Sequence, residues 1–110
     1  MNEFTIYCSP EQTKKAINLG APIEVDFQFN FKTVIINNKA YIVPTAEQML
    51  GWLEEQGIHE IRLVHLKDAW MFYIFLDGNM LPDEYTYPTR KEVTLAAIDA
   101  ALEYLNNNKK

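Results

Sequence analysis

Residues 70–76 have the sequence Trp-Met-Phe-Tyr-Ile-Phe-Leu, an unbroken apolar run, and this run decides the fold. Successive side chains of a β-strand point to opposite faces of the sheet. One face would then carry four of these residues and the other face three: Trp70, Phe72, Ile74 and Leu76 against Met71, Tyr73 and Phe75. A strand that is apolar on both faces belongs in the middle of a covered sheet. The run therefore predicts a central strand.

The chain around this run predicts further antiparallel pairing. Residues 60–66 are expected to form a hairpin with residues 70–76 across Lys67-Asp68-Ala69. Asp77-Gly78 is a turn signal, because glycine and aspartate favour tight turns. A short strand is expected around residues 84–87.

The first half of the chain also has a period of two. Apolar and polar residues alternate from Ile23 to Lys32, which predicts a strand with one buried and one wet face. Phe27 and Phe29 would then face the same core as Ile98 and Leu102. A second hairpin is expected between residues 34–36 and 40–43. Its turn would be Asn37-Asn38, since asparagine tolerates the positive φ of tight turns.

Three segments begin with the pattern of a capping box, in which a hydroxyl residue and a Glu or Gln three positions later satisfy each other's backbone N–H groups. The three pairs are Ser9 with Gln12, Thr45 with Gln48, and Thr89 with Glu92. Pro10 suits the first helical position, and Gly20 and Gly57 suit helix ends. The sequence thus predicts helices from Ser9 to about residue 19, over about 45–56 and over about 89–106.

The last helix has apolar residues on most of its circumference. Its narrow polar edge consists mainly of Glu92, Asp99 and Glu103. A helix of this kind should contact more than one neighbour.

The predicted order of elements is a helix, two or three strands, a helix, three strands and a helix, which with two strands in the first group is α-β-β-α-β-β-β-α. It indicates an α+β fold in which an antiparallel sheet has three helices packed mainly on one face. A chain of 110 residues with 48% hydrophobic content suits a single domain over residues 1–110. Pro44 marks the place where a seam within that domain could lie.

Charge and composition exclude several classes of partner. The net charge is −5, and eleven acidic residues face four basic ones over residues 44–105. Attachment to phosphate backbones or anionic lipid depends on positive charge, so the charge argues against nucleic acid and membrane as partners. The single cysteine, the lack of a signal-peptide pattern and the lack of a long apolar stretch favour a cytoplasmic protein.

Few residues could support chemistry. Cys8 precedes a helix, where a thiolate would be favoured, but a lone cysteine is more often a small buried apolar residue. His59 and His65 are six residues apart and have no third soft ligand. Asp77-Gly78-Asn79 resembles the start of a calcium loop, yet Pro82 occupies the position that requires glycine. The sequence therefore predicts no catalytic, cofactor-binding or metal-binding residue, and no enzyme.

Aromatic residues are more numerous than one short helix could cover. They are Phe27, Phe29, Phe31, Trp70, Phe72, Tyr73 and Phe75. An apolar face that a small domain leaves open is commonly covered by a partner. An unidentified protein partner is therefore expected, and a homodimer is one form of it.

Short motifs resemble small phage and prophage proteins of Bacteroides-like gut bacteria. The similar residues are Glu11-Gln12-x-x-Lys15, Leu19-Gly20, Pro44-Thr45-x-x-Gln48, Trp52-Leu53-x-Glu55, Ile58-His59-x-Ile61 and the alanine-rich region from Tyr87 to Leu105. The resemblance covers nearly the whole chain and implies the same order of elements, but no activity.

A second resemblance is local. The order helix, three strands, helix over residues 44–105 is similar to a double-stranded-RNA-binding domain. In that family the last helix begins with basic residues that grip phosphates, and Arg90 and Lys91 match the first two of them. Thr94 replaces the third, and the loop at residues 67–69 lacks the family's glycine and histidine.

These observations favour a non-enzymatic accessory protein of a phage or mobile element that works by binding another protein. The alternative is a nucleic-acid-binding module formed by residues 44–105.

Overall fold

The computed structural model describes residues 5–25, 32–76, 78–82 and 85–108, and it contains three helices and five strands within them. In chain order these are α1 (Pro10–Asn18), β1 (Thr33–Ile36), β2 (Lys39–Ile42), α2 (Ala46–Glu55), β3 (Ile58–His65), β4 (Trp70–Leu76), β5 (Asn79–Pro82) and α3 (Arg90–Asn107). The predicted order of elements is confirmed.

The helices begin where the capping pattern predicts. At Ser9 and at Thr45 both halves of the capping box are formed, so the hydroxyl accepts from the N3 backbone N–H and the N3 glutamine returns the bond. At α3 only the first half is formed among the described residues, with Thr89 Oγ1 accepting from the N–H of Glu92 at 3.1 Å. The reciprocal bond predicted for Glu92 was therefore wrong.

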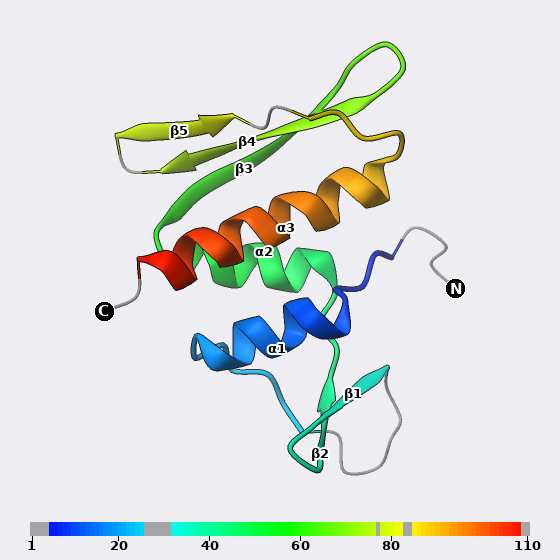
Figure 1. Cartoon of the computed structure of the whole chain (residues 1–110), viewed down its shortest axis with the longest axis vertical. Coiled ribbons are helices and arrows are strands. Elements are labelled where there is room, and N and C mark those ends of the chain that lie inside the picture. The colour runs from blue at the N-terminus through cyan, green and yellow to red at the C-terminus, as the bar shows by residue number, and fades with distance from the viewer. Residues whose placement is uncertain (1–4, 26–31, 77, 83–84, 109–110) are drawn as a thin grey trace.

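The run at residues 70–76 is the central strand. β4 lies between β3 and β5 in an antiparallel three-stranded sheet (Figure 1). The third strand of this sheet was predicted around residues 84–87 and lies instead at residues 79–82. Tyr87 still pairs with the sheet, because its backbone exchanges bonds of 2.7 and 2.8 Å with Trp70. β5 and Tyr87 thus share one edge of β4, and the turn at Gly78 sets the position of β5.

The other two strands form a separate sheet. β1 and β2 pair antiparallel through Asn37 and Asn38, whose φ angles of 51° and 68° confirm the predicted tight turn. The five strands therefore divide into a two-stranded and a three-stranded sheet, where the sequence had indicated one. No backbone ladder joins them among the described residues.

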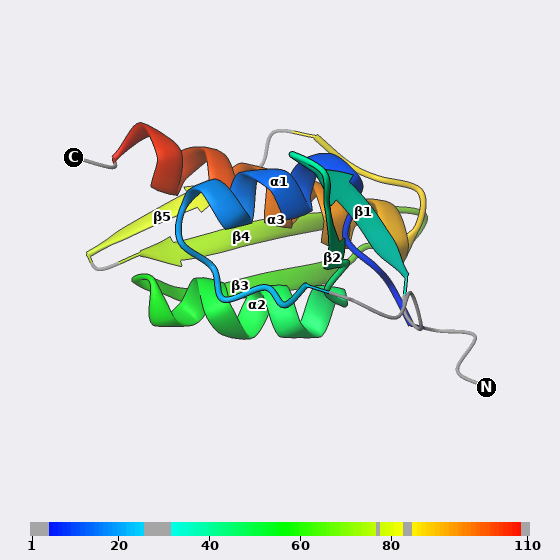
Figure 2. The same ribbon diagram turned by 90° about the horizontal axis from the view of Figure 1, so that it is seen from below.

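All three helices lie on the same side of the β3–β4–β5 sheet (Figure 1). α3 packs on β3 and β4, α2 packs beside α3 and against β3, and α1 packs on α3 and β1. Seen from below, α1 and α3 overlap toward the β5 edge of this sheet, and α2 lies next to β3 at its other edge (Figure 2). The prediction that α3 contacts more than one neighbour is confirmed.

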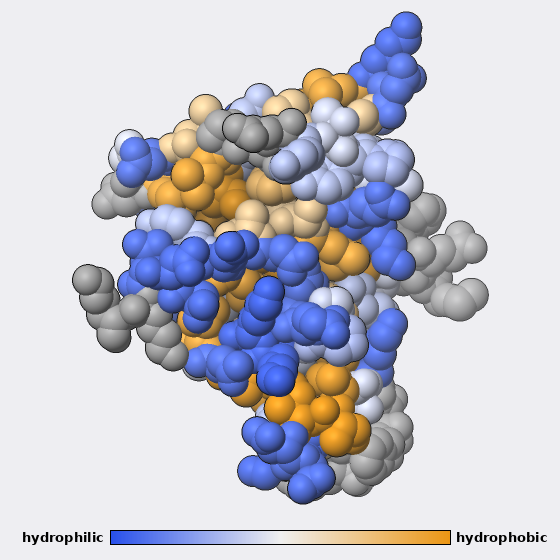
Figure 3. Space-filling model, in the orientation of Figure 1, coloured by the Kyte–Doolittle hydropathy of each residue, from blue (hydrophilic) through white to orange (hydrophobic). Residues whose placement is uncertain are grey.

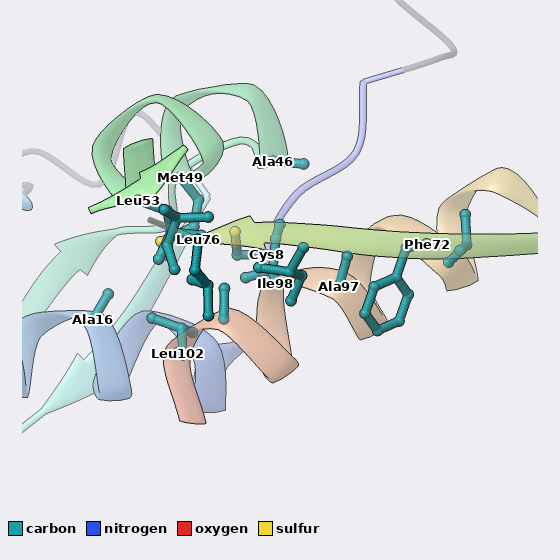
Figure 4. Close-up of a cluster of buried hydrophobic side chains, with 14 of the residues drawn as sticks. Cys8, Ala16, Ala46, Met49, Leu53, Phe72, Leu76, Ala97, Ile98 and Leu102 are labelled. Atoms are coloured by element: carbon teal, nitrogen blue, oxygen red, sulfur yellow. The ribbon is translucent and has the colours of Figure 1, made fainter. Parts of the chain in front are cut away.

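The core lies between the sheet and the helices (Figure 4). β4 contributes Phe72, Ile74 and Leu76, and α2 contributes Met49 and Leu53. From α3, the fully buried apolar residues are Val93, Ala97, Ile98, Ala101 and Leu102. Burial of these apolar side chains is the main favourable term in folding, at about 25 cal/mol per Å² of apolar surface removed from water.

The predicted strand over residues 23–32 lies mostly outside the described residues, and so do Phe27 and Phe29. Val25 makes an isolated antiparallel bridge with Tyr41 of β2. Within the described ranges, no helix has both the length and the apolar character that crossing a bilayer requires.

Candidate interaction surface

The face of the β3–β4–β5 sheet that points away from the helices is the candidate site. Phe72, Ile74 and Leu76 face the core, so Met71, Tyr73 and Phe75 must lie on the opposite face of β4. Directly paired residues on neighbouring antiparallel strands lie on the same face. The register therefore adds Glu60, Arg62 and Val64 of β3 and Met80 of β5. These seven residues are called the outer sheet face below.

The middle of the outer sheet face is a row of three side chains in mutual contact. The hydroxyl of Tyr73 donates to Sδ of Met71 at 3.8 Å. The rings of Tyr73 and Phe75 have centroids 6.4 Å apart and are tilted by 39°. All three side chains are half-buried. Aromatic pairs at this separation attract each other beyond the area they bury, so the row is held in one arrangement.

A charged pair borders this row. The guanidinium carbon of Arg62 lies 5.1 Å above the centroid of the Phe75 ring, which is a cation–π contact. The same guanidinium makes a salt bridge of 3.2 Å with Glu60, two residues earlier on β3. The side chains of Arg62 and Glu60 are 57% and 49% exposed. Glu60 and Arg62 thus balance each other's charge at the β3 side of the outer sheet face.

No helix covers the outer sheet face in the part of the chain that the structure describes. α3 is the only described helix that contacts β4, and it does so on the core side. In Figure 1 the sheet lies along the upper margin of the molecule, with every helix below it. Met80 is 48% exposed. The prediction that β4 is covered on both faces was therefore wrong.

Cys8 has the structural role that its residue type favours. It is 3% exposed, lies in the core beside Ile98, and its thiol donates to the carbonyl oxygen of Thr45 at 3.8 Å (Figure 4). Burial, and secondarily the negative charge of Asp99, raise the pKa of the Cys8 thiol from 9.0 to about 12. The thiol is therefore protonated at neutral pH, and nucleophilic chemistry at Cys8 is disfavoured.

The two histidines lie at different ends of β3. The His65 ring stacks on Trp70, with centroids 4.3 Å apart and planes 9° apart. His59 lies on the exposed surface next to the bulge between Ile58 and Glu60. Among the described residues, no three His, Cys, Asp or Glu side chains come together to hold a metal ion.

A groove of about 660 Å³ lies between α2 and residues 21–24, which follow α1 in the chain. Its lining is largely apolar and includes Ile23, Met49 and Trp52. The ammonium nitrogen of Lys32 lies 5.0 Å from the centroid of Tyr7 at its rim.

The two basic residues that match the double-stranded-RNA-binding domain lie on the surface. Arg90 and Lys91 are both exposed in the first turn of α3, and Glu92 is exposed next to them. Thr94, which stands where a third basic residue would be needed, is 4% exposed and donates to the carbonyl oxygen of Arg90 at 2.7 Å. This turn of α3 therefore presents two cations beside an anion.

The sequence predicted the second apolar face of β4, but not which residues of β3 and β5 lie beside it. Arg62 and Met80 belong to the outer sheet face only because β3 and β5 pair with β4 in one particular register. The alternation of Glu60, Arg62 and Val64 with Ile61 and Leu63 was the available signal, since it shows which side of β3 is wet.

Comparisons of the chain with protein-family models, curated proteins and solved structures gave no match. The similarities to phage proteins and to the double-stranded-RNA-binding domain therefore stay predictions.

Proposed function

We propose that this protein is a non-enzymatic accessory protein, of the phage or mobile-element type, that binds another protein through the outer sheet face. The observation that supports this most is the row Met71, Tyr73 and Phe75 on an open face of the central strand. Soluble monomers seldom leave a contiguous apolar patch open unless it has a function.

The composition of the outer sheet face suits this proposal. Aromatic residues, methionine and arginine are enriched in protein interfaces, and aromatic and arginine side chains supply most binding hot spots. Here Phe75 is in contact with both Tyr73 and Arg62 before any partner arrives. A surface that is already ordered loses less conformational entropy on binding, which increases affinity.

A photo-crosslinking amino acid at position 73 tests the proposal in the cell that makes the protein. We expect a discrete protein adduct at Tyr73 that disappears when Phe75→Glu is added. The matched control is Ile35 of β1, which is 61% exposed. The surface over the β1–β2 hairpin also shows a hydrophobic patch (Figure 3). A lack of any adduct at Tyr73, or equal adducts at Tyr73 and Ile35, would contradict the proposal.

The alternative function, nucleic-acid binding, has one observation in its favour. α2, β3, β4, β5 and α3 follow one another in the order of a double-stranded-RNA-binding domain, with both helices on one face of the sheet. In this reading the first turn of α3, with Arg90 and Lys91, would contact the duplex.

A further inference from the structure

We propose that the partner at the outer sheet face is a second copy of this chain, packed face to face with its strands antiparallel to those of the first. This inference rests on the proposed function and names the occupant of the same surface.

The chain exposes more surface than a folded monomer of its mass normally does. The whole chain has an accessible surface of 7531 Å². A folded monomer of 12.8 kDa exposes about 6,300 Å² on the usual scaling of surface with mass. The excess of about 1,200 Å² exceeds the roughly 800 Å² that each partner contributes to an interface of standard size. The molecule is also flat, with extents of 42 × 39 × 18 Å. A dimer would remove surface that a monomer of this size does not normally expose.

The outer sheet face is neutral although the chain as a whole is acidic. Two copies that each carry −5 repel each other wherever their acidic residues meet. The outer sheet face has one cation, Arg62, and one anion, Glu60, and its other five residues are uncharged. It is therefore a neutral surface on which this repulsion is weakest.

Glu60 and Arg62 lie two residues apart on β3, so a two-fold axis can set each of them opposite the other in a second copy. A two-fold axis in the plane of the interface and perpendicular to the strands places β3 over β3 of the other copy, running in the opposite direction. With the axis level with Ile61, Glu60 of one copy lies opposite Arg62 of the other, and the reverse pair forms as well. Stacked sheets normally pack with their strands within about 30° of each other, so this pairing survives the usual twist.

The aromatic row follows the same symmetry. Arg62 is level with Tyr73 and Glu60 is level with Phe75 in the β3–β4 register. The same axis therefore places Tyr73 of one copy over Phe75 of the other, twice. Two aromatic contacts and two ion pairs would then lie in one continuous interface, with the apolar pairs at its centre and the charged pairs beside them.

Sedimentation of the purified chain over about 1–500 µM, a range that brackets typical weak and moderate dimers, tests this inference. We expect twice 12.8 kDa at the upper concentrations. Arg62→Glu and Glu60→Arg each set like charges against each other, so each should raise the dimer dissociation constant roughly 100-fold. The double swap Glu60→Arg with Arg62→Glu restores opposite charges, and dimerisation should return. A surface contact that does not pair these two positions would not show this rescue.

Circular dichroism melts provide the control for folding. The Glu60–Arg62 salt bridge within one copy is exposed, and exposed pairs contribute little to stability. At concentrations where the wild type is also monomeric, both single variants should therefore melt close to the wild type. A wild-type dimer that neither charge variant nor Phe75→Glu weakens would overturn the inference, because the dimer would use another surface. A monomer at every concentration would also overturn it. If a monomer still gives the Tyr73 adduct with a different protein, the proposed function stands without the dimer; if it gives none, both fail.

Discussion

The side chain of Gln12 connects α1 to α3 through Asp99. Its Nε2 donates to Oδ1 of Asp99 at 3.0 Å and to the carbonyl oxygen of Leu95 at 2.7 Å, while its Oε1 accepts from the N–H of Ser9 at 3.0 Å. Gln12 is 1% exposed. One residue thus caps its own helix and holds that helix against α3.

This relationship predicts a large cost for Gln12→Ala. Three hydrogen bonds would be lost and buried polar groups left without partners, so the free energy of unfolding should fall by about 2–3 kcal/mol. Gln48 is the matched control, because it makes the same capping bond at Thr45 on an exposed surface. Gln48→Ala should cost only about 0.5–1 kcal/mol. Equal losses in urea denaturation would show that the bonds to α3 add nothing.

The raised pKa of Cys8 predicts a pH-dependent loss of stability in alkali. Below pH 9 the thiol is protonated in both the folded and the unfolded chain, so it adds no pH dependence. Between pH 9.0 and about 12 the unfolded chain loses this proton and the folded chain keeps it. The free energy of unfolding should therefore fall by about 1.4 kcal/mol per pH unit in that window.

Cys8→Ala supplies the reference for this measurement. Every other titratable group is common to the two proteins, so the difference between the two slopes isolates the thiol. A wild-type slope no steeper than that of Cys8→Ala would contradict the raised pKa. Thiol reagents should also modify folded Cys8 slowly at pH 8, as burial and protonation both require.

Double-stranded RNA and DNA should bind weakly. Affinity for a duplex depends on several clustered cations that displace counterions, and the first turn of α3 offers Arg90 and Lys91 beside Glu92. In fluorescence anisotropy at about 150 mM salt, the dissociation constant should stay above about 1 µM. Submicromolar binding that is lost in the Arg90→Ala, Lys91→Ala variant but kept when Lys14 and Lys15 are replaced would favour the nucleic-acid alternative.

The turn between β1 and β2 predicts opposite effects for two small residues. Asn38 has a φ of 68°, which glycine adopts freely and alanine does not. Asn38→Ala should destabilise the protein by about 1 kcal/mol, whereas Asn38→Gly should be neutral or stabilising. If both variants melt at the same temperature, the strain assigned to this turn is absent.

Local patterns predicted most of this fold. The caps at Ser9 and Thr45 and the turn at Asn37-Asn38 depend on contacts within a few residues, which the sequence displays directly. The apolar run at residues 70–76 likewise fixed the centre of the sheet. The last strand was misplaced because β5 is held by its pairing with β4 rather than by its own composition.

The outer sheet face shows what such patterns do not contain. The second apolar side of β4 was visible in the sequence, but whether a helix would cover it depends on where α3 packs. The place of Arg62 over Phe75 depends on register, which no single segment determines. The double role of Gln12 was hidden for a similar reason, because its capping pattern is complete without α3.

The contact between Gln12 and α3 also has a consequence for synthesis on the ribosome. Gln12 and Leu95 are 83 residues apart, so α1 is translated long before its partner helix exists. At about 5–20 residues per second, the interval is roughly 4–17 s. During that interval the buried faces of α1, including Ala16, have no α3 to pack against. The nascent chain should thus present this face of α1 to chaperones until α3 has emerged from the exit tunnel.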